Sequence, residues 1–193
     1  MTDLTTEEVA NLFQRPGPLQ WSGIDLSGAD LHQAHFRGAQ LSDANLCEAN
    51  LAGANLSGCS LIGANLIGAN LAGADLSQAD LRLADLSGAN LQQANLNRAD
   101  LSEASFYGAD LSGADLTAAN LSSAKLTSAI CRGAKLISAD LSGAEMRLVD
   151  LRQADLTDAS LVGANLIAAK LTEAELSLAD FTVAIMPDGT KHP

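Results

Sequence analysis

Residues 54–73 read ANLSG CSLIG ANLIG ANLAG, which is four copies of one five-residue unit. The third residue of each copy is Leu, and the first is Ala or Cys. The same period continues without an insertion in both directions, from Ile24 to Ile185. A strict, fixed period indicates a repeat architecture, in which each unit buries its apolar side chains against the next one.

A period of five fits neither an α-helix nor a flat strand, because side chains recur every 3.6 residues in a helix and every 2 in a strand. A helix with Leu at every fifth position would spread those side chains around its whole surface. A solenoid satisfies the pattern if each pentapeptide forms one side of a coil with its Leu and Ala pointing inward. Stacked coils would then pair as parallel β ladders about 4.8 Å apart.

The unit Ala-Asp/Asn-Leu-x-x, as in Ala29-Asp30-Leu31-His32-Gln33 and Ala54-Asn55-Leu56-Ser57-Gly58, resembles the repeat of the pentapeptide-repeat proteins. The resemblance implies an all-β fold, a right-handed quadrilateral parallel β-helix with four pentapeptides per coil. About eight coils at about 4.8 Å each would make a rod about 40 Å long. It also implies that the Asn or Asp orders the corner by hydrogen bonds to the main chain. The last residue of the unit is often Gly, which permits a positive φ in a tight turn.

Three segments follow from this pattern. Residues 1–20 are predicted to form an N-terminal helical cap and linker, because Thr5 and Glu8 match a capping box that begins a short α-helix. Residues 21–186 form the β-helix, with Trp21 in the first Leu position. Residues 187–193 form a turn and a tail, and the tail is expected to be loosely held.

Composition and charge exclude several kinds of partner. The net charge of −12 disfavours direct nucleic-acid binding, which needs clustered Lys and Arg. No stretch approaches the ~20 apolar residues of a membrane span, and no secretory signal is visible. Cys59 and Cys131 occupy inward positions and Cys47 an outward one, a pattern that fits free thiols in a reducing compartment. We therefore expect a cytoplasmic protein without nucleic-acid or membrane contacts.

Sequence signatures of catalysis are absent. There is no phosphate-binding loop, dinucleotide-binding glycine pattern, zinc-protease motif or nucleophile elbow. His32 and His35 lie in neighbouring repeats and are expected to be solvated surface side chains. The sequence predicts no catalytic residue, no cofactor and no metal site, and hence a protein that is not an enzyme.

One side of the predicted rod is rich in carboxylates, since residues twenty positions apart stack on the same face. Two interpretations stay open: an acidic stripe with a function, or Asp side chains that only order the corners. The residues of this acidic stripe are Asp43, Asp80, Asp100, Glu103, Asp140 and Asp180.

Some outward positions carry apolar side chains where Ser is usual. Ile62 and Ile67 lie on adjacent faces of one coil, and Val162 and Ile167 repeat the arrangement five coils further on, about 25 Å away. Tyr107 is the lone tyrosine. These five residues are candidate contacts for a protein partner, or they are ordinary scattered exposure.

The pattern therefore favours a protein–protein interaction or scaffold module that presents rigid flat β faces, as a monomer or weak dimer. The alternative comes from the resemblance, which implies that some members mimic DNA and inhibit or protect DNA gyrase. A duplex about 40 Å long carries about 24 charges. The chain carries far fewer, with a net charge of −12, which disfavours the alternative.

Overall fold

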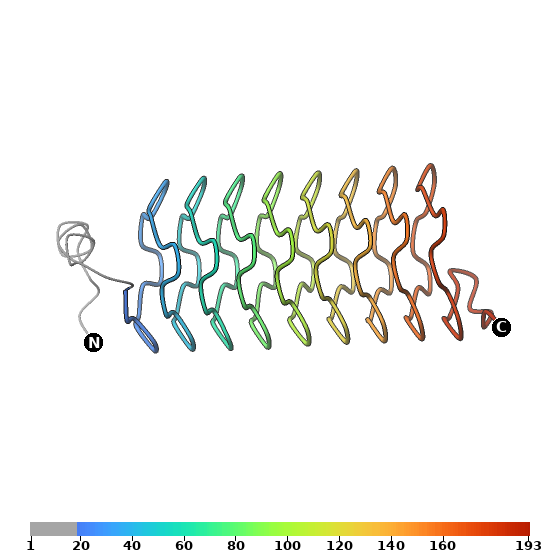
Figure 1. Cartoon of the computed structure of the whole chain (residues 1–193), viewed down its shortest axis with the longest axis horizontal. Helices are drawn as coiled ribbons and strands as arrows, with labels where there is room; N and C mark the ends of the chain where they lie inside the picture. Colours follow the sequence, from blue (N-terminus) through green and yellow to red (C-terminus); the bar gives the residue numbers. More distant parts are fainter. Residues whose placement is uncertain (1–18) are drawn as a thin grey trace.

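The computed structural model describes residues 19–193, which form a rod of stacked four-sided coils (Figure 1). Every parallel backbone pairing joins two residues twenty positions apart, from Gln20↔Gln40 to Asn165↔Ile185. These bridges occur singly at every fifth residue, so residues 19–193 contain no longer strand and no helix. The predicted four-sided parallel β structure, with four pentapeptides per coil, is confirmed for this part of the chain.

We number the four walls of the rod by the inward residue of one coil. Face 1 carries Leu61, face 2 carries Leu66, face 3 carries Leu71 and face 4 carries Leu76. Residues twenty positions before or after belong to the same column on the adjacent coil. Two corner residues follow each inward residue, and a corner is named by the faces that it joins, so that corner 1–2 follows face 1.

Backbone hydrogen bonds connect each unit to both neighbouring coils. In the unit that begins at Ala44, the Leu46 N–H donates to the Asn65 carbonyl at 2.7 Å and the Glu48 N–H donates to the Ile67 carbonyl at 2.8 Å. Toward the preceding coil, the Asn45 N–H donates to the Ile24 carbonyl at 2.8 Å. Because almost every buried main-chain group finds a partner in this way, the narrow coil needs no helix or long strand.

The corners form through turns that require a left-handed residue. The Ala49 N–H donates to the Leu46 carbonyl at 3.1 Å, and Glu48 between them has a φ of 57°. Nineteen described residues with a positive φ at this corner position are not Gly. The side chain before the inward residue supports the turn, since the Cys47 N–H donates to Asn45 Oδ1 at 3.3 Å. The corner role implied for Asn and Asp is therefore confirmed.

Asn side chains also link successive coils. The Asn65 Nδ2 group donates to Asn45 Oδ1 at 3.1 Å, and the Asn45 Nδ2 group donates to Asp25 Oδ1 at 2.9 Å. A second ladder on face 3 connects Asn90, Asn70, Asn50 and Asp30 in the same direction. An amide can both donate and accept, so the ladder adds inter-coil bonds without adding charge.

The core is a column of Leu and Ala along the axis. Most inward side chains are fully buried, and the larger Phe36 and Phe106 are buried as well. Trp21 is buried in the first inward position and packs edge-on against Phe36, with ring centroids 5.6 Å apart. The Ala side chains are buried as well, as the sequence pattern predicted.

The cysteines give a direct test of the inward assignments. Cys59 and Cys131 are buried and Cys47 is partly exposed. Burial raises the pKa of the Cys59 thiol to about 11 and that of Cys131 to about 12. At pH 8 we expect Ellman's reagent to titrate one thiol in the native protein and three in denaturant, because only a thiolate reacts. A native reading of two or three fast thiols would show that the walls open.

The sequence predicted a loosely held C-terminal tail, but the structure shows the tail bonded to the last coil. Lys191 pairs antiparallel with Ile185, and the His192 N–H donates to the Ala184 carbonyl at 2.8 Å. The His192 ring lies 6.0 Å from the Phe181 ring, centroid to centroid. The predicted turn lets the tail fold back, with Gly189 at a φ of 84°. The aromatic contact and the two-residue pairing hold the tail against the last coil.

The last coil is only partly covered by this tail. Its inward residues Leu171, Leu176 and Phe181 are half-buried, unlike those of the middle coils. Backbone N–H groups that would pair with a further coil have no backbone partner in residues 19–193: Leu171, Glu173, Leu176, Leu178, Phe181 and Val183. The C-terminal end of the rod is thus an open β edge.

Two further expectations concern an N-terminal helix and a membrane-spanning segment. The helical cap predicted around Thr5 and Glu8 lies outside the described residues. Among the described residues, no helix has the length and apolar character needed to cross a membrane.

Candidate functional site

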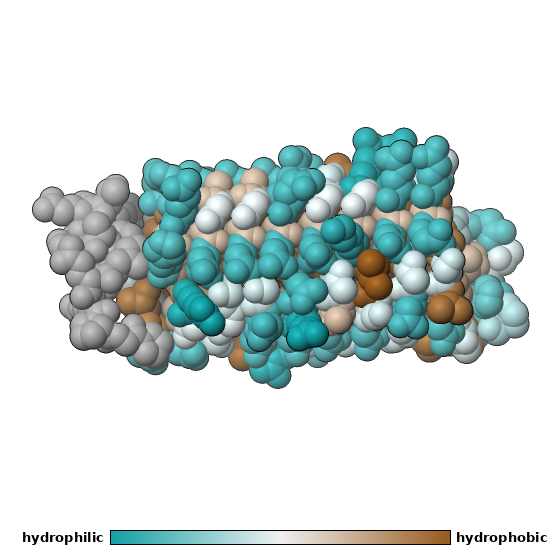
Figure 2. Space-filling model, turned by 45° about the horizontal axis from the view of Figure 1, so that its top comes forward, coloured by the Kyte–Doolittle hydropathy of each residue, from teal (hydrophilic) through white to brown (hydrophobic). Residues whose placement is uncertain are grey.

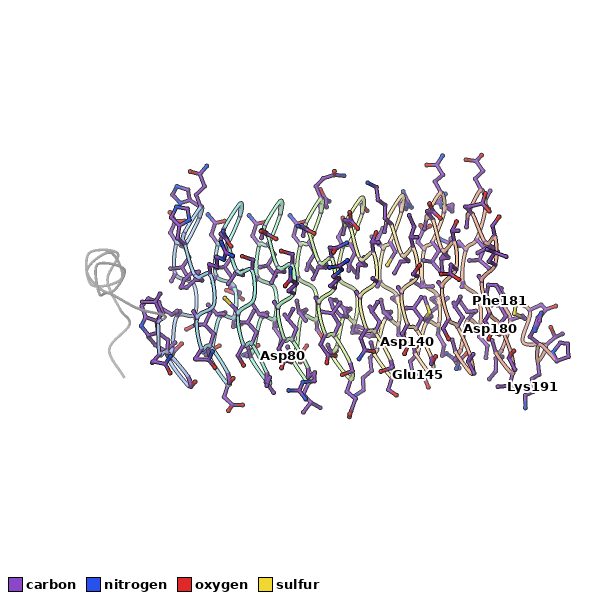
Figure 3. All side chains as sticks on the ribbon, viewed as in Figure 1. Asp80, Asp140, Glu145, Asp180, Phe181 and Lys191 are labelled. Carbon is purple, nitrogen blue, oxygen red and sulfur yellow. The ribbon has the colours of Figure 1, made fainter. Side chains whose placement is uncertain are left out.

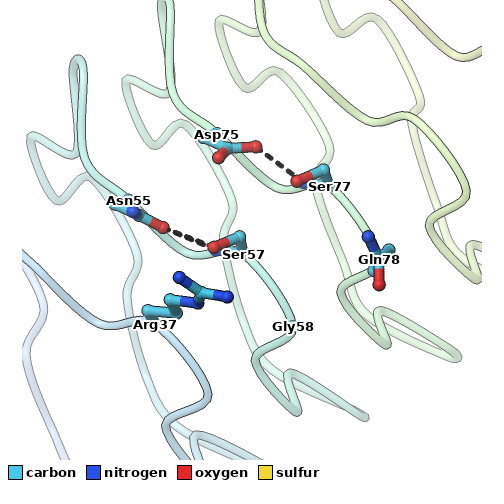
Figure 4. Close-up of a pocket in the computed structure, with 7 residues that line it drawn as sticks. All are labelled: Arg37, Asn55, Ser57, Gly58, Asp75, Ser77 and Gln78. Atoms are coloured by element: carbon cyan, nitrogen blue, oxygen red, sulfur yellow. Dashed lines mark hydrogen bonds between the residues drawn. The ribbon is translucent and has the colours of Figure 1, made fainter.

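The surface of the rod offers only shallow, polar depressions. The one in Figure 4 has a volume of about 310 Å³ and lies mainly on corner 4–1, where Arg37 is part of its lining. Its polar side chains already serve the corners: Ser57 Oγ donates to Asn55 Oδ1 at 2.7 Å, and the Ser77 N–H donates to Asp75 Oδ1 at 3.0 Å. The lining therefore resembles the rest of the repeat surface.

The histidines lie apart from these depressions. The His32 ring contacts the Asp30 carboxylate at 2.9 Å, and both side chains are largely exposed. This contact joins neighbours in one repeat and spans two positions of the chain. Within the described residues, no group of three or more His, Cys, Asp or Glu side chains is arranged to hold a metal ion.

The acidic stripe is divided between two columns. Asp80, Asp100, Asp140 and Asp180 belong to one column of face 1, where Ser60, Asn120 and Ser160 interrupt the acidic run. Figure 3 shows Asp80, Asp140 and Asp180 along the same side of the rod. Asp43 and Glu103 lie instead at corner 1–2, at left-handed positions with φ of 57° and 60°.

The four carboxylates of the face 1 column all bond to their own turns. Asp100 Oδ1 accepts from the Ser102 N–H and hydroxyl, and Asp180 Oδ1 accepts from the corresponding groups of Thr182. The Thr182 hydroxyl and N–H lower the pKa of Asp180. Arg82 forms a two-point contact with Asp80, with both bonds at 2.8 Å, and lowers its pKa. The carboxylates of this column therefore also order the corners.

The apolar candidates lie along the two corners that border face 2. Ile62 and Val162 occupy corner 1–2, whereas Ile67, Tyr107 and Ile167 occupy one column of corner 2–3. Ile67 and Tyr107 are exposed, with 41% and 60% of their surface accessible, and the other three are partly exposed. The structure thus brings all five candidates to the borders of a single wall.

The most exposed large apolar side chains follow the same distribution. Five of the six in the described chain border face 2: Ile67, Leu83, Tyr107, Leu148 and Val183. The sixth, Leu178, lies at corner 4–1. Figure 2 shows that apolar side chains interrupt a mainly hydrophilic surface at only a few places. The exposed large apolar side chains are therefore concentrated along the borders of face 2 and are not evenly scattered around the rod.

Some of these positions were not among the five candidates. Val183 lies at corner 1–2 with a φ of 55°, one coil beyond Val162. Leu148 donates its N–H to the Ile167 carbonyl at 2.9 Å, which makes the two side chains neighbours on corner 2–3. The signal in the sequence is a large apolar residue at the corner position where Gly is common. It becomes visible when the sequence is written in rows of twenty.

Comparison with known proteins gives one sequence family. The family of pentapeptide repeats matches the chain in eight copies, within residues 24–61, 49–88, 79–117, 114–153 and 150–186. None of the curated proteins matches the chain.

The chain is also similar to several solved structures. HetL from the cyanobacterium Nostoc sp. strain PCC 7120, described as involved in heterocyst differentiation regulation, is 32% identical, with 98% of this chain and 100% of HetL covered and a TM-score of 0.39. Rfr23 from the cyanobacterium Cyanothece 51142 is 28% identical over 63% of this chain and 86% of its own, with a TM-score of 0.46. A trypsin-treated form of QnrB1, a plasmid-mediated fluoroquinolone resistance protein, is 21% identical, with 84% of this chain and 81% of QnrB1 covered and a TM-score of 0.49.

HetL and Rfr23 are both described as pentapeptide repeat proteins. The repeat matched by the family begins at residue 24 and ends at residue 186, and it includes all four faces of the rod. The chain belongs to the pentapeptide repeat family.

Proposed function

We propose that this chain is a non-enzymatic protein-interaction module that binds a protein partner along face 2. The observation that carries the proposal is the concentration of exposed apolar side chains on corners 1–2 and 2–3. Ile67 and Ile167 stand five coils apart, about 24 Å at the spacing of paired strands. A partner that spans this length would contact Tyr107 between them, an aromatic side chain of the kind enriched at interface centres.

The position of two leucines supports this proposal. Leu83 and Leu148 occupy left-handed corner positions with φ of 62° and 58°, where a residue with a side chain costs about 1–2 kcal/mol relative to glycine. Both side chains are more than half exposed, so burial in the free protein offsets little of this cost. Folding stability does not explain an apolar residue at such a position, whereas contact with a partner does.

The rigidity of the wall supports it further. The inward residues of face 2 are fully buried from Leu46 to Leu166, and each unit is bonded to both adjacent coils. A surface that is already ordered loses little conformational entropy on binding. Face 2 can therefore bind through a modest number of apolar contacts.

The test is a tagged pull-down from the source lysate with a face 2 variant and a matched control. The face 2 variant combines Leu83→Gly, Tyr107→Ser and Leu148→Gly, and it should fold well because Gly suits both left-handed corners. The control combines Ile137→Ser and Leu178→Gly, which remove apolar side chains from corner 4–1. Both variants are first shown to melt at or above the wild-type temperature.

We expect the wild type and the control to retain the same partner through moderate salt, and the face 2 variant to lose it. Retention of that partner by the face 2 variant would assign the contact to another part of the rod. Loss from both variants would likewise contradict a role specific to face 2.

A second candidate function is mimicry of DNA toward an enzyme such as DNA gyrase. It is favoured by the face 1 column that carries Asp80, Asp100, Asp140 and Asp180. The neutral residues in this column, and the contact of Arg82 with Asp80, weaken its field. A gyrase supercoiling assay separates the two functions, since no effect at micromolar protein removes this candidate.

The proposal includes a cytoplasmic location and a monomer or weak dimer. The open β edge of the last coil is where weak self-association would occur, because N–H groups without a backbone partner and half-buried inward side chains lie at this end of the rod. Sedimentation at several protein concentrations tests the oligomeric state.

A further inference from the structure

A cluster of two arginines around a buried carboxylate lies on corner 3–4, away from face 2. Arg132 Nε donates to Asp150 Oδ2 at 2.8 Å. Arg152, one coil after Arg132, donates through Nε to Asp150 Oδ1 and through Nη2 to Asp150 Oδ2, both at 2.8 Å. The Asp150 side chain is only 7% exposed, whereas the two arginine side chains are 52% and 39% exposed. Asp150 thus holds two guanidinium groups that face solvent.

Most donors of these guanidinium groups remain available. A guanidinium carries five N–H donors, and Asp150 uses one from Arg132 and two from Arg152. The Thr172 hydroxyl on the following coil also has no hydrogen-bond partner among residues 19–193. Donors from three successive coils therefore converge on one corner with few acceptors beside them.

These groups line a depression of about 280 Å³. Its lining residues are Arg132, Arg152, Gln153, Thr172 and Glu173. Glu173, the carboxylate of the lining, accepts from Gln153 Nε2 at 2.8 Å. Lys170 pairs with Asp150 on the adjacent coil and adds a third cation to this part of the wall. These three cations lie near three carboxylates, those of Asp150, Glu173 and Asp110, and the charge of Asp110 interacts with that of Arg132. This part of the wall is therefore less acidic than the whole chain, which has a net charge of −12.

The buried carboxylate also fixes the geometry of the cluster. Its bonds to Arg152 and Arg132 hold the pKa of Asp150 well below its usual range, so it stays ionised as the pH falls toward 4. Each guanidinium is bound through its Nε edge, which leaves terminal amino groups free. Planar guanidinium groups held in this way are well suited to paired hydrogen bonds with carboxylate or phosphate oxygens.

We propose that Arg132, Arg152 and Thr172 form a binding site for an oxyanion, either a phosphate ester or a carboxylate presented by a partner. The site is independent of the docking function proposed for face 2, because faces 2 and 4 lie on opposite walls and corner 3–4 does not border face 2. Glu173 limits the affinity by repulsion and so favours anions whose oxygens approach from the Thr172 side.

The experiment follows the arginine Nε–H signals of the ¹⁵N-labelled full chain by NMR at pH 6.5. Inorganic phosphate and acetate are titrated separately at constant ionic strength, because screening weakens exposed charge pairs. We expect saturable shifts at Arg132 and Arg152 and none at Arg98, a corner arginine that serves as an internal control. If the shifts saturate at a lower concentration of phosphate than of acetate, the natural ligand group is a phosphate ester. The reverse order identifies a carboxylate.

Two variants test the assignment of the site. Arg132→Gln is expected to raise the anion concentration needed to saturate the Arg152 shift by about tenfold, since it removes a charged group with several N–H donors. Arg98→Gln is expected to leave that concentration unchanged. Glu173→Gln should strengthen binding by removing the repulsion. Shifts that never saturate, or that are equal at Arg98 and Arg152, overturn the proposal, and the wild-type titration gives this answer even if Arg132→Gln folds poorly.

Discussion

Replacing Phe106 with alanine is expected to cause the largest loss of stability of any single change in the middle of the rod, about 3–5 kcal/mol. Phe106 is fully buried in the face 2 column, between Leu86 and Leu126 on the adjacent coils. Its removal leaves a cavity that the walls cannot close, because every unit is bonded to the coils before and after it. The measurement is denaturant unfolding followed by circular dichroism.

Phe106→Leu is the matched control for this change. It restores the usual residue of the repeat and keeps most of the apolar volume, so a loss below about 1.5 kcal/mol is expected. Equal losses for the two variants would mean that the ring itself, and not the filled volume, stabilises this coil.

Replacing Ala94 with leucine is expected to destabilise the rod by about 1–3 kcal/mol or more, through overpacking. Ala94 is buried, and its column places Ala74 and Ala114 on the adjacent coils. The neighbours cannot move apart, since the Asp115 N–H donates to the Ala94 carbonyl at 2.9 Å and the Asn95 N–H donates to the Ala74 carbonyl at 2.9 Å. Each lost kcal/mol should lower the melting temperature by about 2–4 °C in a chain of this size.

The control for Ala94→Leu is Asn97→Leu, which adds a leucine to an outward corner position of the same unit. Ile67 shows that such a position accepts a branched apolar side chain. The control should melt close to the wild type. A normal melting curve for Ala94→Leu would refute the inward assignment of the Ala column.

Much of the fold could be predicted from the sequence because one local rule is repeated without a slip. The inward positions of Leu and Ala and the burial of Cys59 and Cys131 follow from the period of five. The corner role of Asn and Asp was implied by the resemblance to pentapeptide-repeat proteins. The fold of the tail could not be predicted in this way. Lys191 and His192 lie beyond the repeat, and their pairing depends on contacts with Ile185, Ala184 and Phe181 in the last coil.

The candidate site was predicted only in part. Ile67 and Tyr107 were recognised as outward apolar residues because they replace Ser in the repeat. Their grouping around face 2 with Leu148 and Val183 required the twenty-residue register. The Arg132–Asp150–Arg152 cluster was missed because Arg132 lies 18 positions before Asp150 in the sequence and joins it only when the coils stack.

The sequence by itself determined the architecture of this protein. A period of five with small and large apolar residues in fixed positions indicated a solenoid that buries them, and the resemblance to pentapeptide-repeat proteins implied four sides. The tertiary structure alone decided which surface residues meet. It also imposed left-handed geometry on residues such as Leu83 and Val183, which would avoid it in isolation. The physical reason is that inter-coil hydrogen bonds and core packing, summed over every unit, outweigh the local preference of a single corner residue.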